Sequence, residues 1–174
     1  YFTVMGASST IVNGRKIAHM KRVAGQRGLP LVFLGESSGA RIPETMGAAG
    51  MSASGSDPTQ YVRLRETPWA AAILGPCYGS SSWYTCLSDF KVIRRGGLLS
   101  VSSAQLVNQA TGSTVDPEAL GGWRLHSETT GLVDQVVDSD EEALAAIKRF
   151  LSYLPSHCNE TPPVCPVPAG SGDA

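Results

Sequence analysis

Apolar residues occur along the chain in short continuous runs that alternate with segments of helical periodicity. The runs at residues 31–34 and 69–74 predict buried strands, because a strand that is covered on both faces is apolar throughout. Further strands are predicted at residues 1–5, 90–93, 98–102 and 131–137. Strands that alternate with helices predict an α/β fold, in which helices are layered on a sheet.

A helix is predicted over residues 10–27, where Ile17, Met20 and Ala24 recur at three- and four-residue spacing. Gly28 follows directly, and a glycine after the last helical residue is a common helix end. Shorter helices are predicted at residues 58–65 and 80–87.

The last predicted helix begins at Ser139, where Ser139-x-x-Glu142 has the spacing of a capping box, and it ends at Pro155. Residues 156–174 are rich in proline and glycine and predict a linker or a disordered tail. At the other end the chain opens inside a predicted strand without a methionine, so we expect a fragment or one piece of a split protein.

Composition narrows the function classes. The 174 residues are 42% hydrophobic and 17% charged, which is typical of one globular domain. A net charge of −1 gives no general attraction to nucleic acid or to an anionic membrane, and no apolar run approaches the ~20 residues of a spanning helix. The four cysteines have no C-x-x-C spacing and favour reduced thiols, and the three histidines have no ligand spacing, so no metal is expected.

The pentapeptide Gly35-Glu36-Ser37-Ser38-Gly39 follows an apolar strand and matches the G-x-S-x-G nucleophile elbow of serine hydrolases. An elbow requires a helix immediately after the serine, and Pro43 opposes one there. Asp134 and His157 follow in the order of a catalytic triad, but His157 lies in the predicted tail. A serine hydrolase with Ser37 as nucleophile is therefore the weaker hypothesis.

A second hypothesis uses the backbone. Gly39 and Ala40 follow one apolar strand, and Gly79 and Ser80 follow another. Small residues let a ligand approach the main chain closely, and ligands of α/β folds bind at the carboxyl ends of strands. The two loops either form an oxyanion hole for a thioester enolate or are ordinary tight turns.

Four segments carry motifs that occur in the same order in one family: TVMGASSTIVNGRKI, LPLVFLGESSGARIPE, GPCYGSSSWYTCLSDF and LGGWRLHSETTGLVDQVVDSDEEALAAIKRFLSYLP. They resemble the carboxyltransferase subunits of biotin-dependent acyl-CoA carboxylases, which belong to the crotonase superfamily. The chain departs from the family's Asp-Ser-Gly-Gly-Ala-Arg at Glu36 and Ser38, and from its Ala-Gly-Gly-Ala at Tyr78, Ser80 and Ser81.

The resemblance implies a crotonase-like (ClpP/crotonase) spiral of β-β-α units. Residues 1–155 correspond to the N-terminal or beta half of the carboxyltransferase, lacking its first part. The implied activity is transfer of CO₂ from carboxybiotin to the α-carbon of an acyl-CoA, through an enolate held in a backbone oxyanion hole. Two alternatives remain open: a subunit of a biotin-dependent acyl-CoA decarboxylase, and a non-catalytic assembly subunit.

The resemblance also assigns the site. Gly39, Ala40, Gly79 and Ser80 match the two loops of the oxyanion hole. The residues matched to the coenzyme A and acyl sites are Gly6, Ala7, Ser8, Arg15, Lys16 and Tyr78; Arg15 and Lys16 equally fit a solvated helix face.

The implied cofactor is biotin, carried as carboxybiotin on a partner carrier protein, with acyl-CoA as substrate. The implied partners are the C-terminal or alpha half of the carboxyltransferase or a second subunit, a biotin carboxyl carrier protein and biotin carboxylase, in a hetero- or homo-oligomer. The expected location is the cytoplasm, or the mitochondrial matrix in a eukaryote.

Overall fold

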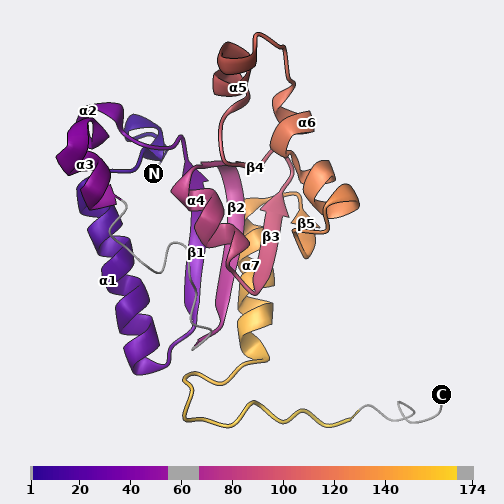
Figure 1. The fold of residues 1–174 in the computed structure, drawn as a ribbon. Helices are drawn as coiled ribbons and strands as arrows, with labels where there is room; N and C mark the ends of the chain where they lie inside the picture. The colour runs from indigo at the N-terminus through magenta and orange to yellow at the C-terminus, as the bar shows by residue number, and fades with distance from the viewer. Residues whose placement is uncertain (1, 55–66, 168–174) are drawn as a thin grey trace.

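The computed structural model describes residues 2–54 and 67–167. Its centre is a five-stranded sheet in which every paired strand is parallel, in the order β1-β2-β3-β5 (Figure 1). The long strand β2 pairs with β1 on one side, and on the other with β3 along its first half and β4 along its second. The strands are β1 (Leu31–Ser37), β2 (Trp69–Tyr78), β3 (Phe90–Arg94), β4 (Leu98–Ser100) and β5 (Gln135–Val137).

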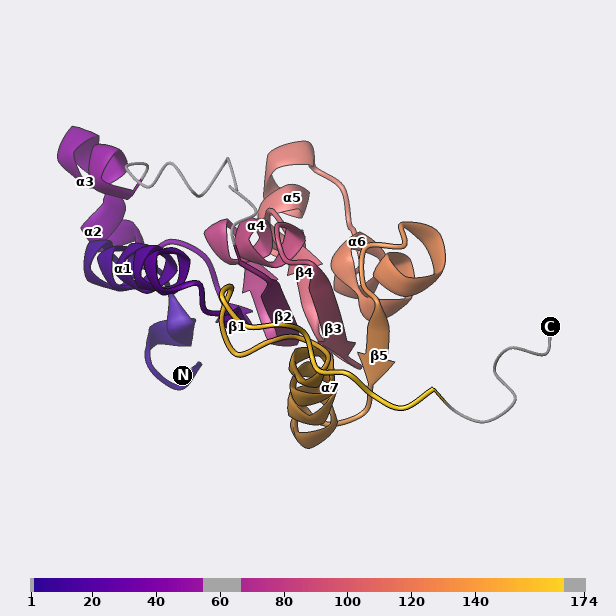
Figure 2. The same ribbon diagram turned by 90° about the horizontal axis from the view of Figure 1, so that it is seen from below.

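Helices cover both faces of this sheet. Helix α4 (Ser80–Cys86) lies over β1 and β2, and helix α7 (Asp140–Ser152) packs on β2 and β3 from the opposite face (Figure 2). Helix α1 (Ile11–Arg27) stands beside the β1 edge of the sheet (Figure 1). The remaining helical segments are η1 (Met5–Ala7), α2 (Ile42–Thr45), α3 (Gly47–Ser54), α5 (Ala104–Thr111), α6 (Pro117–Gly121) and the π-helical η3 (Leu125–Thr129).

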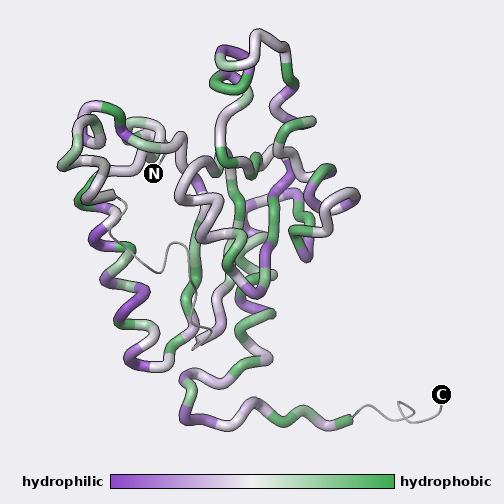
Figure 3. The backbone as a smooth tube through the Cα atoms, viewed as in Figure 1, coloured by the Kyte–Doolittle hydropathy of each residue, from purple (hydrophilic) through white to green (hydrophobic). Residues whose placement is uncertain are grey.

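The core lies between the sheet and α7 and continues on the other face of β2 and β3. Alanines in β2 let the helix approach closely. Hydrophobic residues line much of β1 and β2 (Figure 3). One buried cluster joins α7 to the sheet through Ala70, Ala72, Val92, Val137, Ala143, Ala146 and Ile147. A second contains Ile73, Cys77, Ile93, Leu99 and Val133. Both clusters contain residues of β2, so the core holds this strand and its carboxyl end in place.

Most predicted elements are confirmed, including the layered α/β arrangement. The strand at residues 31–34 forms, but the expectation that it is buried is wrong: on the edge strand β1, Val32 and Leu34 are 40% and 50% exposed. The helix expected over residues 10–27 is α1, and Gly28 ends it in a left-handed conformation. The hydroxyl of Ser139 accepts the N–H of Glu142 at 3.1 Å, which confirms the predicted start of α7. The strand predicted at residues 131–137 is limited to β5, and before it the N–H of Val133 donates to the carbonyl of His126 in η3 at 3.3 Å.

The strand predicted at residues 1–5 is wrong over the part that the structure describes. Residues 2–4 form turns and residues 5–7 form η1, whose residues Met5, Gly6 and Ala7 all have positive φ angles. The side chains of Val4 and Met5 are exposed, so the apolar pattern here does not mark a buried strand.

The helix predicted at residues 58–65 lies outside the described residues. Helices α5 and α6 were not predicted and lie beyond the carboxyl ends of the strands (Figure 1). Past α7, the chain returns toward the start of β1, where the N–H of Cys158 donates to the carbonyl of Gly28 at 2.9 Å. Across the described part of the chain, we find no helix that is long and apolar enough to cross a membrane.

Candidate active site

Two glycine-containing loops meet at the carboxyl ends of β1 and β2. The first runs from Ser38 to Arg41, and the second is formed by Gly79, directly after β2. A Cβ atom built on Gly79 would lie 3.9 Å from the Cα of Gly39, which is van der Waals contact. Gly39 and Gly79 have φ angles of 103° and 64°, in a region that favours glycine. The pairing of β1 with β2 therefore brings together the two loops predicted from the sequence.

The first loop is held by the segment before α1. The N–H of Ser9 donates to the carbonyl of Gly39 at 2.7 Å, and the N–H of Arg41 donates to the carbonyl of Ser9 at 2.8 Å. A trans peptide is planar, and its C=O and N–H point in opposite directions. Because the Gly39 carbonyl faces Ser9, the N–H of Ala40 points away from that segment.

Ser37 closes the same loop from its other end. Its side chain is buried, with 3% exposed, and its Oγ accepts the N–H of Gly39 at 3.1 Å. Both peptide groups of Gly39 are thus engaged, one by Ser37 and one by Ser9. The hydroxyl of Ser37 supports the loop and is not presented to a ligand.

The second loop is the start of helix α4. The N–H of Gly79 donates to the carbonyl of Val101 at 3.1 Å. The Gly79 carbonyl points along the helix and accepts both the N–H of Ser82 at 3.0 Å and its hydroxyl at 2.7 Å. The N–H of Ser80, on the opposite side of that peptide, therefore points out of the helix start.

Two N–H groups remain for a ligand at this place. Within the described residues, neither Ala40 nor Ser80 donates its backbone N–H to any acceptor. A Cβ atom built on Gly39 would meet no atom within 4 Å, so the space beside the first loop is open. Two amide donors on touching loops, one of them at a helix N-terminus, can stabilise an oxygen that gains negative charge.

The residues matched to coenzyme A binding lie partly at this site. The N–H of Ser38 donates to the carbonyl of Gly6 at 2.9 Å. Arg41 donates from Nε to the Oγ of buried Ser8 at 3.1 Å and forms an ion pair with Glu44 at 3.3 Å. Arg41 thus anchors the first loop to Ser8 and Glu44, and residues 6–8 form the wall behind this loop.

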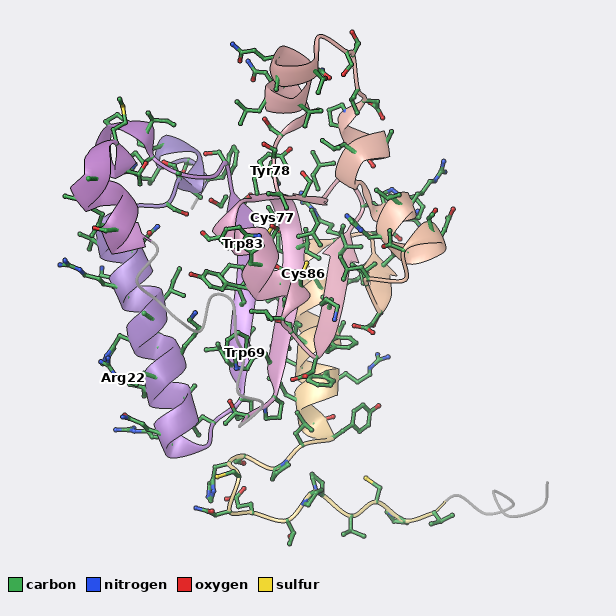
Figure 4. All side chains as sticks on the ribbon, viewed as in Figure 1. Arg22, Trp69, Cys77, Tyr78, Trp83 and Cys86 are labelled. Carbon is green, nitrogen blue, oxygen red and sulfur yellow. The ribbon has the colours of Figure 1, made fainter. Side chains whose placement is uncertain are left out.

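Arg15 and Lys16 are exposed on α1, in the half of the helix that follows Ser9 and Thr10. As exposed cations they are available to an anionic ligand. Tyr78 is the last residue of β2, at the end of the strand that leads into the second loop (Figure 4), and Gly79 follows it in the chain. Partial burial raises the pKa of the Tyr78 phenol above its usual value, so this side chain is neutral at physiological pH.

The structure does not bring Asp134 and His157, the triad partners suggested by the sequence, to Ser37. His157 lies beside the start of β1, since its neighbour Cys158 bonds to Gly28, whereas Ser37 ends that strand, roughly 20 Å away at ~3.3 Å per residue. Asp134 accepts the N–H of Lys91 at 2.7 Å, near the start of β3. The interpretation of Ser37 as a nucleophile therefore has no supporting geometry.

Two other reactive side chains are structural. Cys77 is fully buried, and burial raises the pKa of its thiol to about 12, so it stays protonated. His126 is buried, and its Nε2 lies 2.7 Å from the carbonyl of Leu99, which joins η3 to β4. Among the described residues, no group of three His, Cys, Asp or Glu side chains could hold a metal ion.

Three residues of this site were not singled out from the sequence: Ser9, Ser82 and Val101. Ser82 carried a signal, because a serine three residues after Gly79 has the spacing for a hydrogen bond to that carbonyl. Ser9 and Val101 act through backbone groups only, so no side-chain pattern marks them.

Comparison with known proteins identifies relatives over nearly the whole chain. A family model described as carboxyl transferase domain matches residues 1–171. The propionyl-CoA carboxylase beta chain of Saccharopolyspora erythraea is 32% identical over 99% of this chain and 33% of its own length. The methylmalonyl-CoA decarboxylase subunit alpha of Propionigenium modestum is 32% identical over 93% of this chain and 31% of its own length.

A solved structure also matches. Transcarboxylase 12S, a hexamer determined with methylmalonyl-coenzyme A and methylmalonic acid bound, is 30% identical, with a TM-score of 0.80. The match covers 93% of this chain and 32% of that one. The chain thus spans about a third of the length of the relatives it matches.

Proposed function

The chain belongs to the carboxyl transferase domain family, and from this premise we propose that it binds an acyl-CoA thioester and stabilises its enolate during biotin-dependent carboxyl transfer. The crotonase-like α/β fold expected for such a protein is confirmed by the match to transcarboxylase 12S. The observation that carries the proposal is the pair of unengaged N–H groups of Ala40 and Ser80 on two touching loops.

The chemistry follows from these two donors. Loss of a proton from the α-carbon of a thioester moves negative charge onto the carbonyl oxygen. Amide donors that are fixed before the reaction lower the energy of this enolate more than that of the neutral ester, and removing one donor typically costs 10²- to 10³-fold in rate. Ala40 and Ser80 would hold the oxygen, and Gly39 leaves the space that the oxygen needs.

The rest of the substrate lies along the wall of the first loop. Gly6, Ala7 and Ser8 would contact the pantetheine chain, and Arg15 and Lys16 would meet the phosphates of coenzyme A as exposed cations. Tyr78, next to Gly79, would bound the acyl group. A bulky phenol at this place favours a short acyl chain, which agrees with the propionyl and methylmalonyl esters named in the relatives.

The remaining parts of the reaction come from partners. Carboxybiotin, when bound, supplies the carboxyl group and a ureido nitrogen that can accept the α-proton. We propose that a carboxyltransferase C-terminal half or second subunit binds this group, together with a biotin carboxyl carrier protein and biotin carboxylase. The free cysteines of the chain fit a reducing compartment, the cytoplasm or the mitochondrial matrix.

A second candidate function is decarboxylation of an acyl-CoA, because the matched relatives include a methylmalonyl-CoA decarboxylase subunit alpha. The same two N–H groups would serve it, since loss of CO₂ from a malonyl thioester also produces an enolate. The assembled complex, and not these two N–H groups, would therefore decide between carboxylation and decarboxylation.

Replacement of Ser80 by proline tests the proposal, because it removes the backbone N–H. Ser80 is the first residue of α4, a position where proline is well tolerated in helices. We expect Ser80→Pro to lower carboxyl transfer to propionyl-CoA by about 10²-fold in the complex with its partners, while Ser80→Ala, which keeps the N–H, retains activity. Equal activities of the two variants would refute the backbone role, and absence of acyl-CoA binding by the unaltered complex would indicate a non-catalytic assembly subunit.

A further inference from the structure

The hydroxyl of Ser82 forms a short hydrogen bond in the second loop. Its side chain is buried, with 3% exposed, and its Oγ donates to the Gly79 carbonyl at 2.7 Å. The same carbonyl accepts the backbone N–H of Ser82 at 3.0 Å. This carbonyl and the N–H of Ser80 belong to one peptide group.

A hydrogen bond to the carbonyl of a peptide group affects the direction and the donor strength of the N–H in the same group. The peptide is planar, so a fixed C=O fixes the direction of the N–H. Donation to the carbonyl also polarises the peptide, and hydrogen bonds in a chain strengthen one another. Two donors on the Gly79 carbonyl should make the N–H of Ser80 a better-aimed and stronger donor than that of an ordinary first helical residue.

In the part of the chain that the structure describes, no side-chain hydroxyl donates to the corresponding carbonyl of the first loop, that of Gly39. The carbonyl of Gly39 accepts one hydrogen bond, from the N–H of Ser9 at 2.7 Å. Ser37 acts on the other peptide of Gly39, by accepting its N–H. The two N–H groups are therefore supported differently. Among the residues of known placement, a buried side-chain hydroxyl donates to the peptide group that contains the Ser80 N–H, and none donates to the peptide group that contains the Ala40 N–H.

We propose that Ser82 is a positioning residue that orients and strengthens the Ser80 N–H toward the thioester oxygen. The inference rests on the proposed function. It adds a side chain that strengthens binding of the thioester oxygen without contacting the substrate.

A structural role alone is the competing explanation, and α4 offers a matched control. Ser88 is also buried, with 5% exposed, and its hydroxyl donates to the Tyr84 carbonyl at 3.0 Å, just beyond the other end of the same helix. Ser88→Ala removes the same kind of hydrogen bond at a similar burial, far from the loops. Any general loss of helix stability appears in both variants, whereas an effect on the oxygen site appears in Ser82→Ala alone.

The experiment compares two ligands in the assembled protein: propionyl-CoA and S-propyl-CoA, the thioether that lacks the carbonyl oxygen. The Kd of S-propyl-CoA divided by the Kd of propionyl-CoA measures how strongly the oxyanion hole binds the carbonyl oxygen. We expect Ser82→Ala to reduce this ratio about threefold or more, the scale of one lost hydrogen bond, while Ser82→Thr, which keeps the hydroxyl, and Ser88→Ala leave it unchanged. Infrared spectra of bound [1-¹³C]propionyl-CoA should show a smaller lowering of the carbonyl stretch in Ser82→Ala.

The outcomes separate this inference from the proposed function. If the unaltered protein favours propionyl-CoA and Ser82→Ala retains the full preference and carbonyl shift, the positioning role is overturned and the proposed function stands. The positioning role is also overturned if Ser88→Ala reduces the ratio as much as Ser82→Ala does. If the unaltered protein binds both ligands equally or binds neither, both proposals are wrong.

Discussion

The side chain that glycine lacks at position 79 would lie 3.9 Å from the Cα of Gly39. The two glycines are therefore close neighbours although their loops are far apart in sequence, because β1 and β2 are parallel neighbours and both end at the same edge of the sheet. Both glycines have positive φ angles, so the turns themselves select glycine. The contact places the Ala40 and Ser80 peptides on adjoining loops.

Ser37→Ala distinguishes a supporting hydroxyl from a nucleophile. The variant loses the acceptor for the Gly39 N–H, so we expect carboxyl transfer to fall about tenfold, the scale of one hydrogen bond. Loss of a nucleophile would cost far more, on the order of 10³-fold or above. A fluorophosphonate probe should leave Ser37 unlabelled. Labelling at this residue would support the serine hydrolase hypothesis.

Arg41→Ala should loosen the first loop from the segment before α1. The side chain bonds to Ser8 and Glu44, and a lysine cannot reproduce both contacts with a single ammonium group. We expect amide hydrogen exchange at Ser9 to accelerate about tenfold or more in Arg41→Ala and also in Arg41→Lys. Arg22→Ala is the control, because Arg22 is exposed on α1 and contacts His19. Unchanged exchange at Ser9 in Arg41→Ala would mean that the backbone bonds suffice.

The raised pKa of Cys77 predicts how stability changes with pH. In the unfolded chain the thiol ionises near its ordinary value of 9.0, whereas in the folded protein burial keeps it protonated up to about pH 12. Above pH 9 the unfolded state loses a proton that the folded state keeps, so the free energy of unfolding falls as pH rises, by up to ~1.4 kcal/mol per pH unit.

The measurement compares urea unfolding of the unaltered chain and Cys77→Ala between pH 7 and pH 10.5. The difference in free energy of unfolding should be constant below about pH 8 and should shrink above pH 9, because the variant lacks this ionisation. Parallel curves across the whole range would contradict the assignment.

Ile147→Ala tests the packing of α7 on the sheet. Ile147 is buried among Ala72, Val92 and other members of the first core cluster. Its truncation should lower the free energy of unfolding by roughly 2–5 kcal/mol through lost burial and the cavity that remains. Leu144 lies on the same helix and is 40% exposed. Leu144→Ala should lower the free energy of unfolding by less than about 1 kcal/mol. Equal losses from the two variants would show that α7 does not pack as described.

The strands and helices of the central layer were predictable because their signals are local. The continuous apolar run at residues 69–74 marks a strand that is buried over most of its length, and Ser139 and Gly28 mark helix ends by chemistry that acts within a few residues. The run at residues 31–34 also forms a strand, but Val32 and Leu34 are exposed on it. The same reasoning failed at Val4 and Met5, whose apolar side chains are exposed in a turn. Local hydrophobicity does not record whether another element arrives to cover a segment.

The residues of the candidate site could be named from the sequence, but the sequence could not show which of their backbone N–H groups form hydrogen bonds within the protein. Gly39, Ala40, Gly79 and Ser80 were expected together, and the structure assigns different hydrogen bonds to each. Gly39 and Gly79 donate their N–H groups to Ser37 and Val101, whereas the N–H groups of Ala40 and Ser80 have no acceptor among the described residues. A hydrogen bond between backbone groups distant in sequence leaves no side-chain signature.

The sequence by itself determined the layered α/β architecture, the two glycine loops and the exclusion of an elbow helix after Ser37, because periodicity, turn chemistry and Pro43 act locally. Tertiary structure alone decided that the two loops touch, that Ser9 and Val101 hold them, and that Ser37 and Ser82 point inward. The reason is that strand pairing sets which carboxyl ends become neighbours, and only then does each peptide group find or lack a partner.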